Sequence, residues 1–198
     1  MKLFHSARTR SSRIVWLLEE AGIDYELVPI RLGAADQPAA FLAASPMRKV
    51  PAIEDGDVAL ADSAAIAMYI ADRYPEASLA PAIDDPLRGS YLFWCMFTPG
   101  VMEPALSEKL AGSEPNPRSN GWGNFELMLS TLEAALAEGP WLLGEQFSAA
   151  DILTGSGVVY MRRINVLPAS GVLEDYAERC LARPGLRLAL SMDEPGAD

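Results

Sequence analysis

The stretch "VPAIEDGDVALADSAAIAMYIADRYP", residues 50–75, decides the fold of the first part of this chain. Two apolar runs, Val50–Ile53 and Val58–Ala61, flank an Asp-Gly pair, and this arrangement is a strong signal for a β-hairpin. Asp62 and Ser63 then precede apolar residues with helical spacing, namely Ile66, Tyr69, Ile70 and Tyr74. The stretch therefore predicts two antiparallel strands followed directly by a helix.

The residues upstream of this stretch predict a βαβ unit and one further helix. Lys2–His5 reads as a strand, and Asp24–Ile30 alternates as a second strand does. Between them a helix begins at Ser11 or Ser12 as its cap and ends at Gly22, with apolar residues Ile14, Leu17, Leu18 and Ala21 on one face. A short helix at Gln37–Ser45 completes a βαβαββα unit with a four-stranded mixed sheet.

The remainder of the chain predicts helices only. A proline-rich linker spans residues 75–86, and Pro99 should bend the long helix that follows it. Ser148 and Asp151 match a capping box, for which we expect a folding role. Helical spacing occurs in Leu87–Leu110, Phe125–Ala137, Ala149–Ile164, Leu173–Ala182 and the short segment 183–190. We therefore predict an α/β domain over residues 1–76 and an all-helical domain over residues 84–198.

The composition limits the classes of partner and compartment. The 198 residues carry a net charge of -11, which argues against nucleic acid and anionic membranes as partners. No run of 18 uncharged apolar residues is present, and the N-terminus lacks the apolar core of a signal peptide, so a cytoplasmic location is expected. Two cysteines are too few for a disulfide framework.

The basic turn before the first helix is a local exception to this acidic charge. Four cations precede the first acidic residue, Glu19, and they are Lys2, Arg8, Arg10 and Arg13. A basic, hydroxyl-rich turn at the positive end of a helix favours an anion. The alternative is that a serine caps the helix and the arginines form a solvated face.

Three stretches, in their order and spacing, resemble the cytosolic glutathione S-transferase superfamily, of bacterial type. They are "SPMRKVPAI" (45–53), "LADSAAIAMYIADRYP" (60–75) and "GEQFSAADI" (144–152). The resemblance implies a thioredoxin-like N-terminal domain, a C-terminal helical bundle and a homodimer. It also implies glutathione as co-substrate without a metal, and a detoxifying transfer of glutathione to a small hydrophobic electrophile.

The same resemblance implies the residues that bind glutathione. Val50 precedes an expected cis-proline, Pro51, and its backbone would pair with the cysteinyl unit of the ligand. Lys49, with Arg48 as a further candidate, would bind the glycyl carboxylate. Ser63 would bind the γ-glutamyl carboxylate, and Asp62 would accept from the γ-glutamyl ammonium group.

The residue that activates the thiol is left open by the sequence. Phe4 and His5 stand where tyrosine classes of the family have their tyrosine, and Arg10 stands where other classes have a cysteine. The serine-class position falls on Thr9 or Ser11, so Thr9, Arg10 and Ser11 are the three candidates. The electrophile is expected between the domains, with the candidate contacts Tyr91, Trp94, Phe97 and Met102.

The expected reaction is conjugation of the glutathione thiolate to the electrophile. One alternative is a glutathione-dependent isomerase or peroxidase that uses the same site. A second alternative is a glutathione-binding scaffold without activity, because no unambiguous catalytic residue is present.

Overall fold

A computed structural model describes residues 1–116, 118–167 and 171–193 of the chain. The chain divides into two compact units, each with its own core. The first contains residues 1–79 and the segment from Ala182 onward, and the second contains residues 80–181. Each unit is described by itself below.

The first unit contains the predicted four-stranded mixed sheet. Its strands are β1 (Lys2–His5), β2 (Glu26–Pro29), β3 (Ala52–Asp55) and β4 (Val58–Ala61). Their order is β2-β1-β3-β4, with β1 parallel to β2 and β3 antiparallel to both β1 and β4. The parallel pair confirms the βαβ unit, and the pairing of Asp55 with Val58 around the Asp-Gly turn confirms the hairpin.

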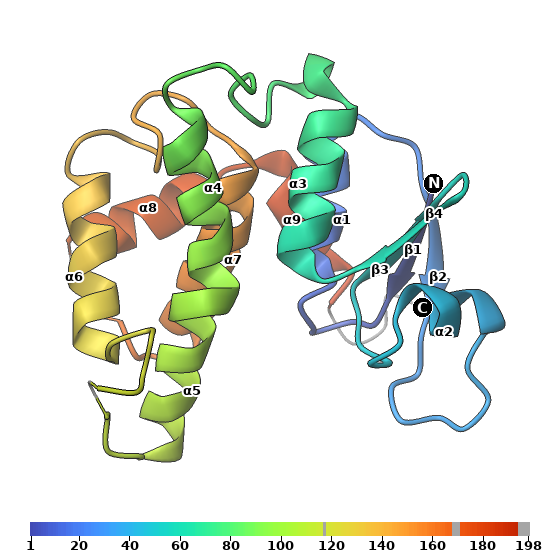
Figure 1. Cartoon of the computed structure of the whole chain (residues 1–198), viewed down its shortest axis with the longest axis horizontal. Helices are drawn as coiled ribbons and strands as arrows, with labels where there is room; N and C mark the ends of the chain where they lie inside the picture. The colour runs from blue at the N-terminus through green and yellow to red at the C-terminus, as the bar shows by residue number, and fades with distance from the viewer. Residues whose placement is uncertain (117, 168–170, 194–198) are drawn as a thin grey trace. The chain divides into compact units, whose positions relative to one another are not determined.

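Helices cover both faces of this sheet (Figure 1). Figure 1 shows α1, α3 and α9 on one side of the sheet and α2 on the other. On the α2 side, Phe4 of β1 packs in a buried cluster with Phe41 of α2 and Ala52 of β3. The helices are α1 (Ser12–Ala21), α2 (Ala39–Ala44), α3 (Ser63–Arg73), the 3-10 turn η1 (Pro75–Ala77) and α9 (Pro184–Ser191).

The second unit is helical, as predicted. Its elements are α4 (Arg88–Phe97), the π-helical turn η2 (Thr98–Met102), α5 (Glu103–Ala111), α6 (Phe125–Leu136), α7 (Ala149–Arg163) and α8 (Val172–Leu181). The predicted long helix is interrupted at Pro99, which lacks a backbone N–H, and the interruption is η2. Asp151 accepts hydrogen bonds from the Ser148 amide at 3.0 Å and hydroxyl at 3.1 Å, and the capping box is present.

The last helix, α9, contacts α1 in the first unit. From its sequence, this segment is expected in the all-helical domain over residues 84–198, because it follows four predicted helices. Its packing has a physical cause that helical spacing does not reveal: a Cβ atom on Gly185 would lie 2.9 Å from Trp16 Cδ1, so only glycine allows this approach.

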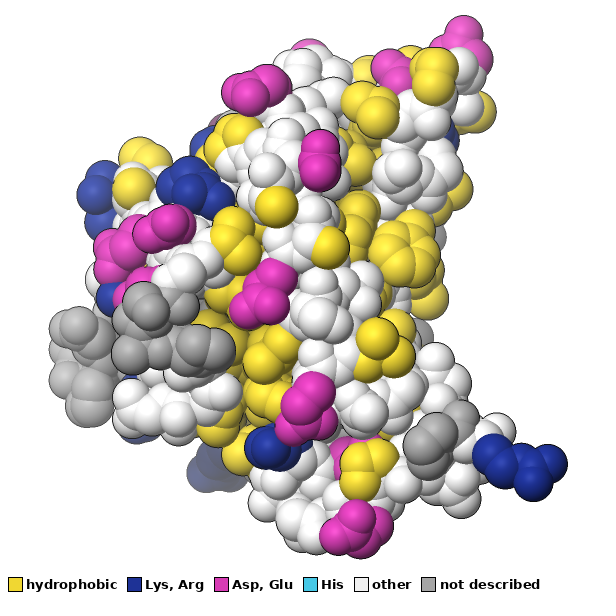
Figure 2. All heavy atoms as spheres, turned by 90° about the vertical axis from the view of Figure 1, so that its left-hand side faces the viewer, with side chains coloured by type: hydrophobic (Ala, Val, Ile, Leu, Met, Phe, Trp, Pro, Cys, Tyr) yellow, Lys and Arg dark blue, Asp and Glu magenta, His cyan; other side chains and the backbone are white. Residues whose placement is uncertain are grey.

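The surface carries both charge and exposed hydrophobic side chains. Figure 2 shows carboxylates dispersed among hydrophobic and uncharged side chains on the face that includes α6. Among the described residues, no helix is both long enough and apolar enough to span a bilayer.

Candidate functional site

The register of the sheet brings three predicted segments to one of its ends. Phe4 near the end of β1 pairs with Ala52 at the start of β3, and Ala52 pairs with Ala61 at the end of β4. The turn of residues 6–11, the Val50–Pro51 pair and the Asp62–Ser63 pair continue from these three strand ends. The structure therefore gathers all the predicted glutathione-binding and thiol-activating residues at this end of the sheet.

Ser11 lies at the centre of a buried hydrogen-bond network. Its side chain is fully buried, at 0% exposure. Its hydroxyl oxygen accepts from the Ser6 amide at 3.1 Å and lies 2.8 Å from His5 Nδ1. It also lies 3.0 Å from the Ser6 carbonyl oxygen, to which the hydroxyl can donate. The Ser11 side chain therefore does not cap α1, contrary to one interpretation of the sequence, because it is turned toward β1.

Thr9 carries the outer hydroxyl of this network. Thr9 Oγ1 lies 2.8 Å from Ser11 Oγ and donates to the Ser6 carbonyl at 2.6 Å, and it accepts from the Ser11 amide at 3.2 Å. Unlike Ser11, Thr9 is only half-buried. Since both hydroxyls reach the Ser6 carbonyl, Ser11 can satisfy that carbonyl if the Thr9 hydroxyl turns toward a ligand.

The turn is basic on its outside and neutral on its inside. Arg8 and Arg10 are exposed, and the first turn of α1 contains no acidic residue. Burial lowers the pKa of His5, whereas the nearby charge of Asp193 opposes this shift. His5 is therefore a neutral partner of Ser11 near pH 7, and the positive potential comes from the arginines and the helix end.

Val50 and Pro51 form the second segment of the site. Their peptide bond is cis, which confirms that prediction. The Val50 side chain packs against the cluster around Phe41. Within the described parts of the chain, no group hydrogen-bonds the Val50 N–H or C=O. This backbone position is thus available to an extended peptide.

Ser45 is a residue of this site that the sequence analysis missed. It is buried, its hydroxyl donates to the Lys49 carbonyl at 2.7 Å, and its oxygen accepts from the Lys49 amide at 3.0 Å. These bonds fix the loop in which Arg48 and Lys49 are exposed. The hydroxyl-containing turn "SPM" is the only sequence signal that could have indicated this role.

Asp62 and Ser63 form the third segment, at the start of α3. Asp62 is the N-cap residue, and its Oδ1 accepts from the Ala64 amide at 2.9 Å. Ser63 is the first helical residue and is mostly buried, and in the described structure its hydroxyl has no hydrogen-bond partner. Asp62 therefore caps the helix, whereas the Ser63 hydroxyl remains available for a ligand.

Unusual backbone conformations border all three segments. Among the described residues, five other than glycine have positive φ, and three of these lie here: Arg8 at 57°, Arg48 at 55° and Asp62 at 78°. Such conformations cost on the order of 1–3 kcal/mol each and cluster at ligand sites. Their concentration at one end of the sheet is an independent reason to place the site there.

The four predicted electrophile contacts lie in the core of the second unit. Tyr91, Trp94, Phe97 and Met102 are at most 7% exposed. The rings of Trp94 and Phe97 lie 4.9 Å apart, and Met102 packs against Gly157 of α7. These side chains thus have a clear packing role.

In the described part of the chain, no three His, Cys, Asp or Glu side chains are grouped to hold a metal ion.

The sheet order, the cis-proline before β3 and the helical unit that follows define a thioredoxin-like domain joined to a transferase-type helical domain. Comparisons with known proteins agree: the family models "Glutathione S-transferase, N-terminal domain" and "Glutathione S-transferase, C-terminal domain" match residues 1–72 and 103–179. The chain belongs to the glutathione S-transferase family.

Three relatives illustrate the similarity. Glutathione S-transferase 3 of Zea mays is 34% identical over 70% of this chain and 68% of its own length. The probable glutathione S-transferase GSTF2 of Oryza sativa is 28% identical over 100% of this chain and 99% of its own. A sphingomonad glutathione S-transferase, solved in complex with glutathione, has a TM-score of 0.80 and 28% identity, with 98% of each chain covered.

Proposed function

We propose that this protein is a glutathione transferase that conjugates the glutathione thiolate to a small hydrophobic electrophile. One observation carries the proposal: the unpaired Val50 backbone lies at the same end of the sheet as the Ser63 hydroxyl and the 6–11 turn. An extended peptide can pair with such a backbone, and glutathione is a peptide with a thiol in its middle residue. The similarity to the sphingomonad protein, which was solved with glutathione, supports this choice of ligand.

The two ends of glutathione would be held by charge and by the start of α3. Ser63 would bind the γ-glutamyl carboxylate through its hydroxyl and its own backbone amide, since it is the first residue of α3 and a helix N-terminus favours anions. Asp62 would accept from the ammonium group with the oxygen that does not cap the helix. Lys49, with Arg48 beside it, would bind the glycyl carboxylate.

Thr9 is the residue that we propose to stabilise the thiolate directly. A free thiol has a pKa near 8.5, and lowering it by about two units requires roughly 2.7 kcal/mol. A charge-assisted hydrogen bond supplies about 1.5–3 kcal/mol. Thr9 is accessible where Ser11 is not, so Ser11 would act through Thr9, and Arg10 would add its positive charge.

We propose that Trp94 contacts the electrophile, because its exposed fraction of 7% is the largest of the four candidates.

We also propose that the protein forms a homodimer. Two hydrophobic residues of α4, Phe93 and Met96, are more than half exposed, at 53% and 52%. A single species near 21.4 kDa in sedimentation at micromolar concentration would contradict the dimer.

Retention on glutathione-agarose followed by a conjugation assay with a generic aryl halide tests the proposed function. We expect retention, elution by free glutathione, and turnover. Absence of retention would contradict a glutathione site. Retention without turnover would instead favour a binding module or a specialised isomerase or peroxidase reaction.

A further inference from the structure

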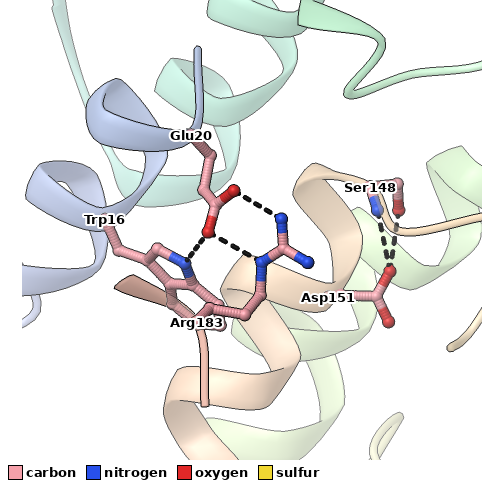
Figure 3. A network of polar contacts seen from close by, with 5 residues as sticks. All are labelled: Trp16, Glu20, Ser148, Asp151 and Arg183. Atoms are coloured by element: carbon pink, nitrogen blue, oxygen red, sulfur yellow. Dashed lines mark hydrogen bonds and ion pairs between the residues drawn. The ribbon is translucent and has the colours of Figure 1, made fainter. Parts of the chain in front are cut away.

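Polar contacts hold α9, the last helix of the described residues, against the end of α1. Arg183, just before α9, binds Glu20 through Nε at 2.7 Å and Nη2 at 2.5 Å. Glu20 also accepts from Trp16 Nε1 at 2.8 Å, so Trp16, Glu20 and Arg183 form one network (Figure 3). Gly185 lies directly against Trp16. These contacts fix the first turn of α9 beside the last turns of α1.

The other end of α9 returns to the start of α1. Asp193 follows the helix, and its Oδ1 accepts from the Arg8 amide at 2.6 Å. The Ser12 hydroxyl donates to the same carboxylate, with its oxygen 2.9 and 2.8 Å from the two carboxylate oxygens. Since Arg183 lies at the end of α1 and Asp193 at its start, α9 runs antiparallel to α1.

The Asp193 carboxylate joins Arg8, within the 6–11 turn, to Ser12, just after the turn. Arg8, inside the turn, has a positive φ of 57°, a conformation that needs support in a residue with a Cβ atom. Ser12, just after the turn, is the first residue of α1. Thr9, Arg10 and Ser11 lie between these two anchors. A rigid support behind a functional side chain is what holds it in a productive orientation.

We infer that Asp193 is a positioning residue for thiol activation: its carboxylate holds the turn so that the Thr9 hydroxyl is aimed at the glutathione sulfur. This inference rests on the proposed function. Asp193 would act through the backbone of the turn and would not touch the ligand. Its own negative charge would raise the pKa of a nearby thiol. Loss of the charge and loss of the positioning therefore shift that pKa in opposite directions, and a substitution can distinguish them.

The test compares Asp193→Ala and Asp193→Asn with Arg183→Gln, which loosens the other end of α9. Removal of a negative charge alone would lower the thiol pKa, so a rise can come only from lost positioning. For Asp193→Ala, we expect the pH midpoint of kcat/KM for the electrophile, measured at saturating glutathione, to rise by about one unit. At neutral pH this kcat/KM should fall about tenfold, and the Kd for glutathione should not change. Asp193→Asn should retain most activity, because its amide oxygen can still accept from Arg8, and Arg183→Gln should lower Tm without moving the midpoint.

An unchanged or lowered midpoint in Asp193→Ala, or an equal rise in Arg183→Gln, would overturn the inference. Amide hydrogen exchange without glutathione gives a second readout that does not depend on activity. The Arg8 and Ser12 amides should exchange faster in Asp193→Ala than in Arg183→Gln, even if the wild-type protein proves to have no transferase activity. Equal exchange in the two variants would show that Asp193 does not hold the turn.

Discussion

The hydroxyl oxygens of Thr9 and Ser11 lie 2.8 Å apart, yet only Thr9 is accessible to a ligand. Two side chains that the sequence offers as equal candidates thus have different positions in one network. The inner hydroxyl is bonded to His5 and Ser6, and the outer one borders the surface of the turn. We therefore expect substitution of Thr9 to affect mainly turnover and substitution of Ser11 to affect mainly stability.

Substitution of Thr9 by valine should lower turnover at neutral pH by roughly ten- to a hundredfold, as the loss of about 1.5–3 kcal/mol implies. The pH midpoint should rise toward the free thiol value near 8.5. The control Thr9→Ser keeps the hydroxyl and should keep most of the rate. A valine variant with the wild-type midpoint would exclude Thr9 as the donor.

Substitution of Ser11 by alanine should act mainly on stability. It removes the partner of His5 Nδ1 and of the Ser6 amide, and an unsatisfied buried group costs about 1–3 kcal/mol. We expect a lower urea midpoint and a smaller loss of turnover than in Thr9→Val. A larger catalytic loss in Ser11→Ala, at unchanged stability, would assign the donor to Ser11 instead.

Ser63→Ala and Asp62→Ala should separate binding from capping. The first should raise the glutathione KM by about tenfold, since one hydrogen bond to a carboxylate is lost, and should leave Tm nearly unchanged. The second should also lower the free energy of unfolding by about 1 kcal/mol, because the cap of α3 is lost. An unchanged KM in Ser63→Ala would remove the γ-glutamyl anchor from the account.

Arg48 holds a backbone conformation that favours glycine, with φ of 55°. Arg48→Gly should therefore be more stable than Arg48→Ala, by up to about 1 kcal/mol, because only glycine relieves the Cβ penalty. Both variants lack the guanidinium, so they should share any change in KM. Equal urea midpoints for the two variants would contradict this explanation.

Asp151 should impose a pH dependence on folding. Burial raises its pKa to about 6, against the four hydrogen bonds it accepts from the Leu142 amide, the Ser148 amide and hydroxyl, and the Tyr176 hydroxyl. The pKa of this carboxyl is 3.8 in the unfolded state, so the folded state binds the proton more tightly. The stabilisation is therefore fully present below pH 3.8 and is lost as the pH rises to about 6. Urea unfolding across this range measures the slope.

Asp151→Asn is the matched variant for that slope. It should abolish the contribution of Asp151 to the pH dependence. It should also cost about 1–3 kcal/mol, since an amide NH₂ then faces hydrogen-bond donors. An identical slope in the wild type and the variant would show that Asp151 does not titrate in this range.

The sheet, and the gathering of the candidate site residues at one of its ends, could be predicted because their signals are local. The Asp-Gly turn, the alternating strands and the residues around Pro51 lie within a few positions of one another, and the register of β1, β3 and β4 then brings distant segments together.

The remainder could not be predicted because it depends on long-range packing. A preference for serine at helix starts does not tell whether Ser11 turns toward the helix or toward His5. The partner of Ser12 lies 181 residues away, so no local pattern indicates Asp193. Helical spacing likewise predicts that α9 is a helix, but not that Gly185 packs on Trp16.

The most direct test of the central claim is the ultraviolet absorbance of glutathione thiolate during titration of the protein at neutral pH. We expect thiolate absorbance to appear in proportion to bound glutathione, because the pKa of the bound thiol should lie about two units below its free value near 8.5. The Thr9→Val variant should bind glutathione with similar affinity but show little of this absorbance. Binding without any thiolate signal in the wild-type protein, or no binding at all, would contradict the claim that this end of the sheet binds and ionises glutathione.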